Sequence, residues 1–414
     1  MERCDWMAVA KLRFKADDGN DYPEWNDFTK LEDISAFITK GATPTTYGFD
    51  WQPNGVYFFR NDCIKNNVFV YGDYSFIAEE ANKFLQRSEV TGGDIVIAIT
   101  GDIGKVGLIP SEVKKANINQ HLARVRIVKD AFPYFVYMYL CSDKVQRTYK
   151  KIKTGLSMPQ LSLAQIRDTN ILVVSLPEQQ KIAEFLSTID TVIEKQKETV
   201  SAWEERKKGV MQKLFSQEVR FKADDGSNFP EWEEKKLGEV GDIVTGNTPS
   251  TKQNDYYGEC YLWVTPTDIT DSREVTSTAK MLTELGYTVA RHIPANSILV
   301  TCIASIGKNA ILRENGSCNQ QINSITPYDE YSVEFVYYLI CQNEKLLHAN
   351  AGTGGMEILN KENFSKIKMY FPCLAEQRKI ADCFSSLDEV IEKQKATLAA
   401  WEELKKGLLQ QMFC

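Results

Sequence analysis

The chain contains one long segment twice, and this duplication constrains its fold more than any other feature. Residues 178–215 read EQQKIAEFLSTIDTVIEKQKETVSAWEERKKGVMQKLF. Residues 376–413, which begin 198 positions later, read EQRKIADCFSSLDEVIEKQKATLAAWEELKKGLLQQMF. Solenoid repeats are much shorter, at about 20 to 50 residues. The chain is therefore expected to use one large structural unit twice.

Both copies are predicted to form single long helices that pair as an antiparallel coiled coil. Apolar residues recur at alternating intervals of three and four, which is typical of a coiled-coil seam. At about 1.5 Å per residue, each helix would be roughly 57 Å long. The seam is expected to contain Ile182, Leu186, Ile189, Ile193, Gln196, Val200 and Trp203 in the first copy, and Ile380, Phe384, Leu387, Ile391, Gln394, Leu398 and Trp401 in the second.

Three residue types interrupt the apolar pattern at the same places in both copies: Gln196 and Gln394, Lys207 and Lys405, Gly209 and Gly407. The glutamines lie at the midpoints, where a buried polar residue would fix the register at some cost in stability. The lysines are expected to extend their charge out of the seam into solvent. The glycines are interpreted as close-packing points or as sites where the helix frays.

Composition restricts the class of protein. With 414 residues, 43% hydrophobic and 25% charged, the chain is expected to form two or three globular domains. A net charge of −7 does not indicate a basic nucleic-acid-binding protein, so any DNA contact would need local basic patches or a more basic partner. The ten cysteines and three histidines lack metal-ligand spacing, and the scattered cysteines favour a reducing, cytoplasmic location. No signal peptide or membrane span is predicted.

A second, shorter block is also duplicated. Residues 13–25 read RFKADDGNDYPEW and residues 220–232 read RFKADDGSNFPEW, each with turn-forming residues typical of a linker. The order is then cyclic: linker, globular domain and helix, twice. The predicted boundaries are an N-terminal segment and linker (1–21), a first globular domain (22–175), a central helix (176–219), a second globular domain (220–373) and a C-terminal helix (374–414).

The two globular regions share landmarks rather than overall sequence. FITKGATPTT at residues 37–46 corresponds to IVTGNTPST at 243–251, and Asn119-Gln120 corresponds to Asn319-Gln320. Short β-branched or aromatic runs alternate with helical periodicity, which predicts an α/β fold for each domain. In the first domain, strands are expected at 56–60, 94–100, 122–128 and 170–174, and helices at 75–85 and 132–152.

Catalytic motifs are not evident. The segment Gly101–Lys105 reads GDIGK, which resembles part of a phosphate-binding loop, but it lacks both the spacing between the glycines and the Ser or Thr after the lysine. The aromatic motif of adenine methyltransferases does not occur, nor do the HExxH and GxSxG motifs. The sequence therefore favours recognition over catalysis, with no metal site.

Polar and basic side chains in the loops are the candidates for contacts with DNA. Thr, Ser, Asn, Gln and Lys can read base edges in the major groove, and clustered lysines can bind phosphates. For each candidate, a solvated loop or helix face is the alternative interpretation. The candidates are Thr43, Thr45, Thr46, Lys105, Asn119, Gln120, Lys150, Lys151 and Lys153 in the first half, and Thr248, Ser250, Lys252, Lys308, Asn319 and Gln320 in the second.

Over nearly its whole length, the chain resembles the specificity (S) subunit of type I restriction-modification enzymes. The resemblance is carried by the two helix openings, EQQKIA at Glu178–Ala183 and EQRKIA at Glu376–Ala381. Each closes a domain that is marked by a Gly-x-Thr-Pro motif, GATP at Gly41–Pro44 and GNTP at Gly246–Pro249. Any one motif is weak evidence, but their duplicated order is specific.

The resemblance implies two similar α/β target-recognition domains, joined by two antiparallel coiled-coil helices in a pseudo-two-fold arrangement. Each domain would read one half of a bipartite, asymmetric site on double-stranded DNA, and the coiled coil would set the spacer. Two methyltransferase (M) subunits would bring S-adenosylmethionine, and restriction (R) subunits would bring ATP and Mg. The chain itself would have no catalytic residues and no cofactor.

Two other interpretations remain open at this point. In one, the chain is a two-headed coiled-coil scaffold that holds protein partners. In the other, it is the specificity subunit of a related methylase–nuclease system. Salt-sensitive and sequence-selective DNA binding would distinguish the DNA-reading interpretations from the scaffold.

Overall fold

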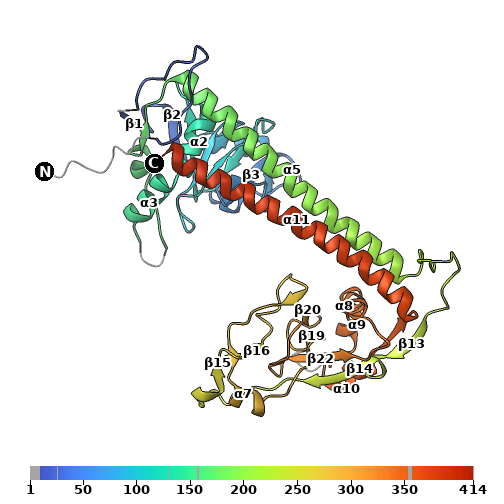
Figure 1. Ribbon diagram of the computed structural model, residues 1–414. Helices are drawn as coiled ribbons and strands as arrows, with labels where there is room; N and C mark the ends of the chain where they lie inside the picture. Colours follow the sequence, from blue (N-terminus) through green and yellow to red (C-terminus); the bar gives the residue numbers. More distant parts are fainter. Residues whose placement is uncertain (1–9, 26, 129, 156–157, 353–356, 414) are drawn as a thin grey trace. The chain divides into compact units, whose positions relative to one another are not determined.

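The computed structural model describes residues 10–25, 27–128, 130–155, 158–352 and 357–413 (Figure 1). Its contacts divide the chain into unit 1, residues 1–197 with 397–414, and unit 2, residues 198–396. The two long helices, α5 (Leu176–Phe215) and α11 (Leu374–Met412), each contribute one part to each unit. Each unit therefore combines a globular α/β domain with two helix segments. This division does not test the domain boundaries expected from the sequence.

Unit 1 is built on two four-stranded sheets. The first is antiparallel throughout, in the order β2-β11-β8-β9. The second has the order β6-β3-β10-β7, and β3 and β10 are parallel. Two-stranded pairs are formed by β1 with β12 and by β4 with β5. The strands are β1 (Phe28–Lys30), β2 (Ser35–Lys40), β3 (Val56–Phe59), β4 (Ile64–Lys65), β5 (Val68–Phe69), β6 (Ser75–Ile77), β7 (Glu89–Val90), β8 (Ile95–Ala98), β9 (Val106–Leu108), β10 (Ala116–Ile118), β11 (Leu122–Ile127) and β12 (Asn170–Leu172).

The helices of unit 1 connect these strands. They are α1 (Glu79–Phe84), α2 (Pro133–Cys141), α3 (Asp143–Ile152) and α4 (Leu163–Arg167), with the 3-10 helices η1 (Pro44–Tyr47), η2 (Asn61–Cys63) and η3 (Gln86–Ser88).

Unit 2 has a similar topology, with a fifth strand in its main sheet and a different edge strand in its second sheet. Its main sheet has the order β14-β22-β19-β20-β17, its second sheet the order β15-β18-β16-β21, and β13 pairs with β23. In the order of neighbouring strands within the sheet, β14, β22, β19 and β20 take the places of β2, β11, β8 and β9. The strands are β13 (Glu233–Lys236), β14 (Gly241–Thr245), β15 (Tyr257–Gly258), β16 (Tyr261–Val264), β17 (Glu274–Val275), β18 (Met281–Leu282), β19 (Ser297–Thr301), β20 (Asn309–Leu312), β21 (Gly316–Cys318), β22 (Ile322–Pro327) and β23 (Lys368–Phe371).

Apart from the long helices, the described residues of unit 2 form five α-helices, compared with four in unit 1. They are α6 (Leu237–Val240), α7 (Glu284–Val289), α8 (Val333–Gln342), α9 (Glu344–Ala349) and α10 (Lys361–Lys366), with the 3-10 helix η4 (Asn254–Tyr256). The parallel pair of β16 and β21 reproduces that of β3 and β10. The expectation of two similar α/β domains is confirmed.

Each domain core is completed by the start of one long helix and the end of the other. In unit 1, Ile182 and Leu186 of α5 and Met412 of α11 are buried in one cluster with the residues of α2. In unit 2, Ile380 and Phe384 of α11 join α8 in the same way, together with Met211 and Leu214 of α5. Burying a large apolar side chain contributes roughly 1.5–3 kcal/mol, so these contacts anchor the helix ends in the domains.

Within each unit, the two long helices pack antiparallel. In unit 1, Lys405 pairs with Asp190 and Glu402 with Lys197, so the residue number falls on one helix as it rises on the other. In unit 2, Lys207 pairs with Asp388 and Lys395 with Glu204. Of the expected seam, Ile182, Leu186, Ile189, Ile193, Val200, Ile380, Phe384 and Ile391 are buried, and Gln196, Trp203, Leu387, Gln394, Leu398 and Trp401 are partly buried.

The expectation that the seam lysines extend their charge into solvent is wrong. Lys405 and Lys207 are mostly buried, and each pairs with an aspartate of the facing helix. A tyrosine hydroxyl also donates to each aspartate, Tyr134 to Asp190 and Tyr338 to Asp388. Burial, and then the neighbouring aspartate, raise the pKa of both tyrosines, so the hydroxyls remain donors. The charge of each seam lysine is therefore compensated by an aspartate of the facing helix and not by water.

Three further expectations are corrected. Close packing at the helix glycines is wrong, because a Cβ at Gly209 or Gly407 would meet nothing within 4 Å. Residues 132–152 form two helices, since Ser142 is extended at φ −62° and ψ 148°. The turn lets α2 be buried on nearly all sides while α3 exposes its basic face. Residues 75–85 begin as strand β6, because Ile77 pairs with Val56, and only then form α1.

Candidate nucleic-acid interface

The Gly-x-Thr-Pro loop and the Asn-Gln turn lie together in each unit. In unit 1, the Oγ1 of Thr43 donates a hydrogen bond to the Oε1 of Gln120. In unit 2, the Oγ1 of Thr248 donates to the Oε1 of Gln320 at 2.6 Å. Both pairs lie at the surface, and we call each of them a Thr–Gln pair. Candidate residues more than 70 positions apart in the sequence thus share one exposed site in each domain.

The glycine of the motif permits this close approach. A Cβ at Gly41 would lie 2.1 Å from the backbone oxygen of Asn119, and a Cβ at Gly246 would lie 2.1 Å from that of Cys318. Carbon and oxygen atoms that are not bonded cannot approach so closely, so any larger residue would push the loop away from the turn. The glycine in the motif is therefore required by packing against the Asn-Gln turn.

Asn119 and Asn319 have a structural role in the turn. Both are buried, and the Oδ1 of each accepts the backbone N–H two residues later, from His121 and Gln321 respectively. Such Asx bonds stabilise turns. The following glutamines, in contrast, are exposed. From the sequence, both residues of the motif were candidates for contacts with DNA. In the structure, the asparagine is used within the turn and only the glutamine is exposed.

A third loop adjoins the turn in each unit. The N–H of Ile99, just after β8, donates to the carbonyl of His121 at 2.9 Å, and the N–H of Cys302 donates to the carbonyl of Gln321 at 2.8 Å. The loops that follow contain the candidates Lys105 and Lys308. Lys105 forms an ion pair with Asp102 at 2.6 Å, and Lys308 is exposed. In each domain, the Asn-Gln turn therefore lies between two other loops, the Gly-x-Thr-Pro loop and the loop that contains the candidate lysine.

The remaining candidates are exposed. Thr45 and Thr46 lie in η1, directly after Thr43, and Ser250 and Lys252 follow Thr248 in unit 2. Lys150 and Lys151 lie in the last turn of α3, and Lys153 follows it. The chain then continues to Gln160, which pairs with Thr100 in the third loop of unit 1. The corresponding helix α9 of unit 2 contains a single lysine, so the basic stretch is a property of unit 1. That any of these residues contacts DNA stays a prediction.

The role of the duplicated linker block could not be read from the sequence. Glu178 is fully buried at the start of α5, and its carboxylate accepts from Arg13 at 3.0 and 3.1 Å and from the indole of Trp25 at 2.8 Å. Arg220 and Trp232 bind Glu376 in the same way in unit 2. The Arg and Trp of the linker thus clamp the first turn of each long helix.

The rest of the Glu-Gln-x-Lys motif also binds the domain. Gln179 accepts the N–H of Phe132 and donates to the carbonyl of Val174, and Gln377 does the same with Ser332 and Pro372. The repeated lysine that follows, Lys181 or Lys379, donates to the carbonyl of the linker residue Lys15 or Lys222. The repeated motifs thus attach each long helix to its domain.

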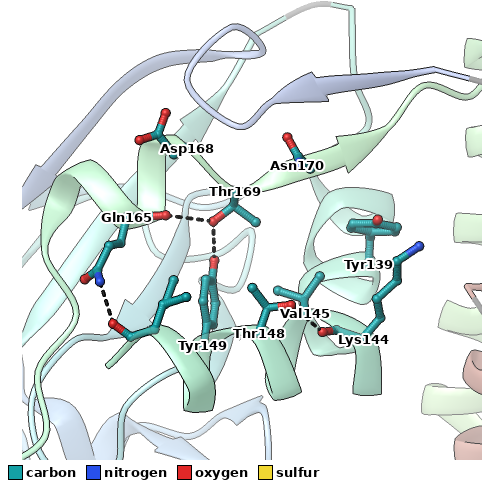
Figure 2. A pocket seen from close by; sticks show the side chains of 10 residues that line it. Tyr139, Lys144, Val145, Thr148, Tyr149, Gln165, Asp168, Thr169 and Asn170 are labelled. Atoms are coloured by element: carbon teal, nitrogen blue, oxygen red, sulfur yellow. Dashed lines mark hydrogen bonds between the residues drawn. The ribbon is translucent and has the colours of Figure 1, made fainter. Parts of the chain in front are cut away.

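A cavity of about 330 Å³ opens in unit 1 beside α3 (Figure 2). Its polar lining is bonded internally, because the hydroxyl of Tyr149 lies 3.0 Å from the Oγ1 of Thr169, and Thr169 in turn donates to the carbonyl of Gln165. Val145 and Ile152 add apolar surface. We assign the cavity no part in the interface.

The described residues contain no group of three or more His, Cys, Asp or Glu side chains placed to hold a metal ion. None of the helices that they form combines the length and the apolar character that crossing a membrane requires.

Comparisons with known proteins agree with this architecture. The family model described as "Type I restriction modification DNA specificity domain" matches residues 23–201 and again residues 230–400. The type I restriction enzyme HindI specificity subunit of Haemophilus influenzae is 24% identical over 455 residues, covering 90% of this chain and 96% of that protein. The MjaIX specificity subunit of Methanocaldococcus jannaschii is 31% identical over 210 residues, 48% of each chain.

A solved structure has the same fold. The crystal structure of a type I restriction-modification S subunit from M. genitalium matches with a TM-score of 0.59 at 15% identity, covering 98% of this chain and 99% of that one. The two matches of the family model together cover more than half of the chain, and each match contains one Thr–Gln pair. The chain therefore belongs to the type I restriction-modification DNA specificity family, as a specificity subunit with two copies of the family's DNA-specificity domain.

Proposed function

We propose that each unit reads one half of a bipartite, asymmetric DNA site. The observation that carries this proposal is the Thr–Gln pair, which recurs in both units with different exposed side chains around it. In unit 1 the motif is followed by Thr45, Thr46 and Tyr47, whereas in unit 2 it is followed by Ser250, Thr251 and Lys252. Base edges are read by individual side chains. Two domains with the same backbone arrangement but different exposed side chains would therefore read two different sequences.

In this proposal, the long helices set the length of the unread spacer. Two observations support this role of the helices. Each helix end is anchored in a domain core, and charge pairs join the two helices within each unit. One inserted heptad lengthens a helix by about 10 Å. That is roughly three base pairs, at about 3.4 Å each.

Insertion of one heptad into both helices, at positions that correspond in the repeat, therefore tests the spacer. We expect the recognised spacer to grow by about three base pairs, or binding to be lost where the rotation around the duplex no longer fits. An unchanged spacer in an active complex would refute the role of the helices.

The chemistry is proposed to belong to partner subunits. The relatives are named as specificity subunits of restriction enzymes, that is, as one part of a larger enzyme. We infer that this chain is non-catalytic and docks two methyltransferase subunits, which use S-adenosylmethionine to modify adenine. Restriction subunits with ATP and Mg would complete the endonuclease, and the complex would act on DNA in the cytoplasm.

The decisive experiment is to express the chain with the methyltransferase subunit encoded beside it, in a host that lacks adenine methylation. Methylated adenines are then mapped across the genome. We expect a single split motif, which gives both half-sites at once. A stable complex with methylation that follows no split motif would contradict the proposal.

A further inference from the structure

Two large aromatic side chains are exposed beside the Thr–Gln pair of unit 1. Tyr47, at the end of η1, is 47% exposed, and Phe84, at the end of α1, is 61% exposed. Their ring centroids lie 5.5 Å apart, and we call them the aromatic pair. Phe84 also lies 5.3 Å from Phe49. A cluster of exposed apolar side chains is typical of a binding surface.

The segments that carry the aromatic pair are attached to the domain. Helix α1 is fixed by Ala81 and Asn82, which are buried, and the amide of Asn82 donates to Asn117 on β10 at 2.8 Å. Tyr47 ends the 3-10 helix η1, which Thr43 precedes and whose proline at the first position restricts the backbone. The rings are therefore exposed because the surrounding structure presents them, rather than because they lie in an unstructured loop.

Exposed cations that could bind phosphates lie on the segments next to the aromatic pair, and the exposed carboxylates of Glu79 and Glu80 lie in the first turn of α1. Lys40 precedes the Gly-x-Thr-Pro loop, Lys83 precedes Phe84, and Arg87 lies in η3, which Thr39 ties to β2 by a hydrogen bond. All three cations are exposed, and within the described part of the chain they form no ion pair. Phosphates are bound by such lysines and arginines.

Unit 2 has an apolar residue at the matching place. Helix α7 follows β18 as α1 follows β6, and its last residue, Val289, is 43% exposed. The carbonyl of Val289 accepts from the amide of Asn247, in the Gly-x-Thr-Pro motif of unit 2, at 3.1 Å. An exposed apolar side chain at a helix end beside the Thr–Gln pair thus occurs in both units, with a bulky residue in one and a small residue in the other.

From this recurrence we propose that the aromatic pair contacts the C5 methyl group of thymine in the half-site that unit 1 reads. In the major groove, thymine alone presents a methyl group, and apolar side chains such as Phe contact it. The neighbouring polar pair, Thr43 and Gln120, would read an adjacent base edge. The inference rests on the proposed function, because it names a chemical group of the DNA that the proposed interface of unit 1 would contact.

The test uses the full chain assembled with its methyltransferase partner and a duplex that carries the mapped site. Each thymine of both half-sites is replaced in turn by uracil, which removes only the methyl group. We expect uracil at one or two positions of a single half-site to weaken binding about four-fold per methyl group, as the loss of one buried methyl contact predicts.

The variants locate the contact. A Tyr47→Ser and Phe84→Ser double variant should bind the thymine and uracil duplexes equally, with the discrimination lost in that half-site alone. Because both side chains are exposed, the fold should be retained. The matched control is Tyr370→Ser, which removes an equally exposed aromatic ring on β23 and should leave the thymine preference unchanged.

The outcomes separate this inference from the function on which it rests. If the wild-type complex prefers the mapped site over a scrambled duplex but never distinguishes thymine from uracil, the inference is wrong and the proposed function stands. The inference is also wrong if the double variant retains the full thymine preference. A complex with no preference for the mapped site would overturn both.

Discussion

Replacing Arg220 by alanine should destabilise unit 2 by about 3 kcal/mol. The Nε and Nη2 of Arg220 donate to the carboxylate of Glu376 at 3.1 and 2.8 Å, and Trp232 supplies a third bond at 3.2 Å. The carboxylate is fully buried, so removal of the guanidinium leaves a charge without its cation. Breaking a buried pair from one side costs about 3–5 kcal/mol. The lower end applies here, because the indole bond remains and the arginine is partly exposed.

Hydrogen exchange on the full chain, followed by mass spectrometry, measures this loss where it occurs. In the Arg220→Ala variant, we expect faster exchange in the first turns of α11 and in β13, with unit 1 unchanged. Arg13→Ala is the matched variant in unit 1 and should act on the start of α5, because its contacts with Glu178 are the same. Urea denaturation gives the free energy of unfolding for both.

The control is an exposed ion pair. Lys366→Ala breaks the bond of Lys366 to Glu362 at 2.6 Å, one helical turn away, and should cost at most about 0.5 kcal/mol. The reasoning is refuted if Arg220→Ala costs no more than Lys366→Ala. Adding Glu376→Gln to Arg220→Ala removes the buried charge and should recover part of the loss, since a neutral amide is less costly to bury.

Three other changes have definite expected outcomes. Thr248→Val should reduce sequence selectivity at one half-site of the methylation map and leave the other unchanged. Gly246→Ala should cost about 1–3 kcal/mol in urea denaturation because its Cβ meets a backbone oxygen, whereas Gly209→Ala, with open space around it, should stabilise by up to about 1 kcal/mol. The double variant Lys150→Gln and Lys151→Gln should leave the recognised sequence unchanged. It should make the slope of the logarithm of the binding constant against the logarithm of the salt concentration less steep, by about 0.9 per lost phosphate contact.

The long helices and the two-copy order were predictable because they are encoded locally. A heptad pattern is visible in any window of the helix, and a repeat needs only the chain itself for comparison. The clamp between Arg13 and Glu178 was not predictable, although both lie in repeated motifs. The two residues are 165 positions apart. No local sequence pattern indicates that the linker block binds the first turn of the long helix. The paired state of Lys405 depends in the same way on Asp190, far away in the sequence.

The candidate interface was predicted by residue type and position in loops, which is a weaker guide. Residue type indicated Thr43 and Gln120, and the structure places them side by side. It could not distinguish Asn119, whose side chain is used within the turn. The exposed Phe84 was not among the predicted residues, because an aromatic residue in a short helix is normally buried. Its exposure depends on how α1 packs against β10, a contact between distant segments.

The division between repeated and differing residues has a physical consequence for specificity. The clamps at Glu178 and Glu376 and the glycines of the two loops meet buried groups or backbone, so most changes there would lower stability. The residues around the Thr–Gln pairs are exposed, and surface substitutions usually change stability by less than about 0.5 kcal/mol. Tyr47 in one unit and Lys252 in the other can therefore differ without refolding either domain. Under the proposed function, each domain could therefore acquire a new DNA target through changes in these exposed side chains alone, while the helix attachments stay the same.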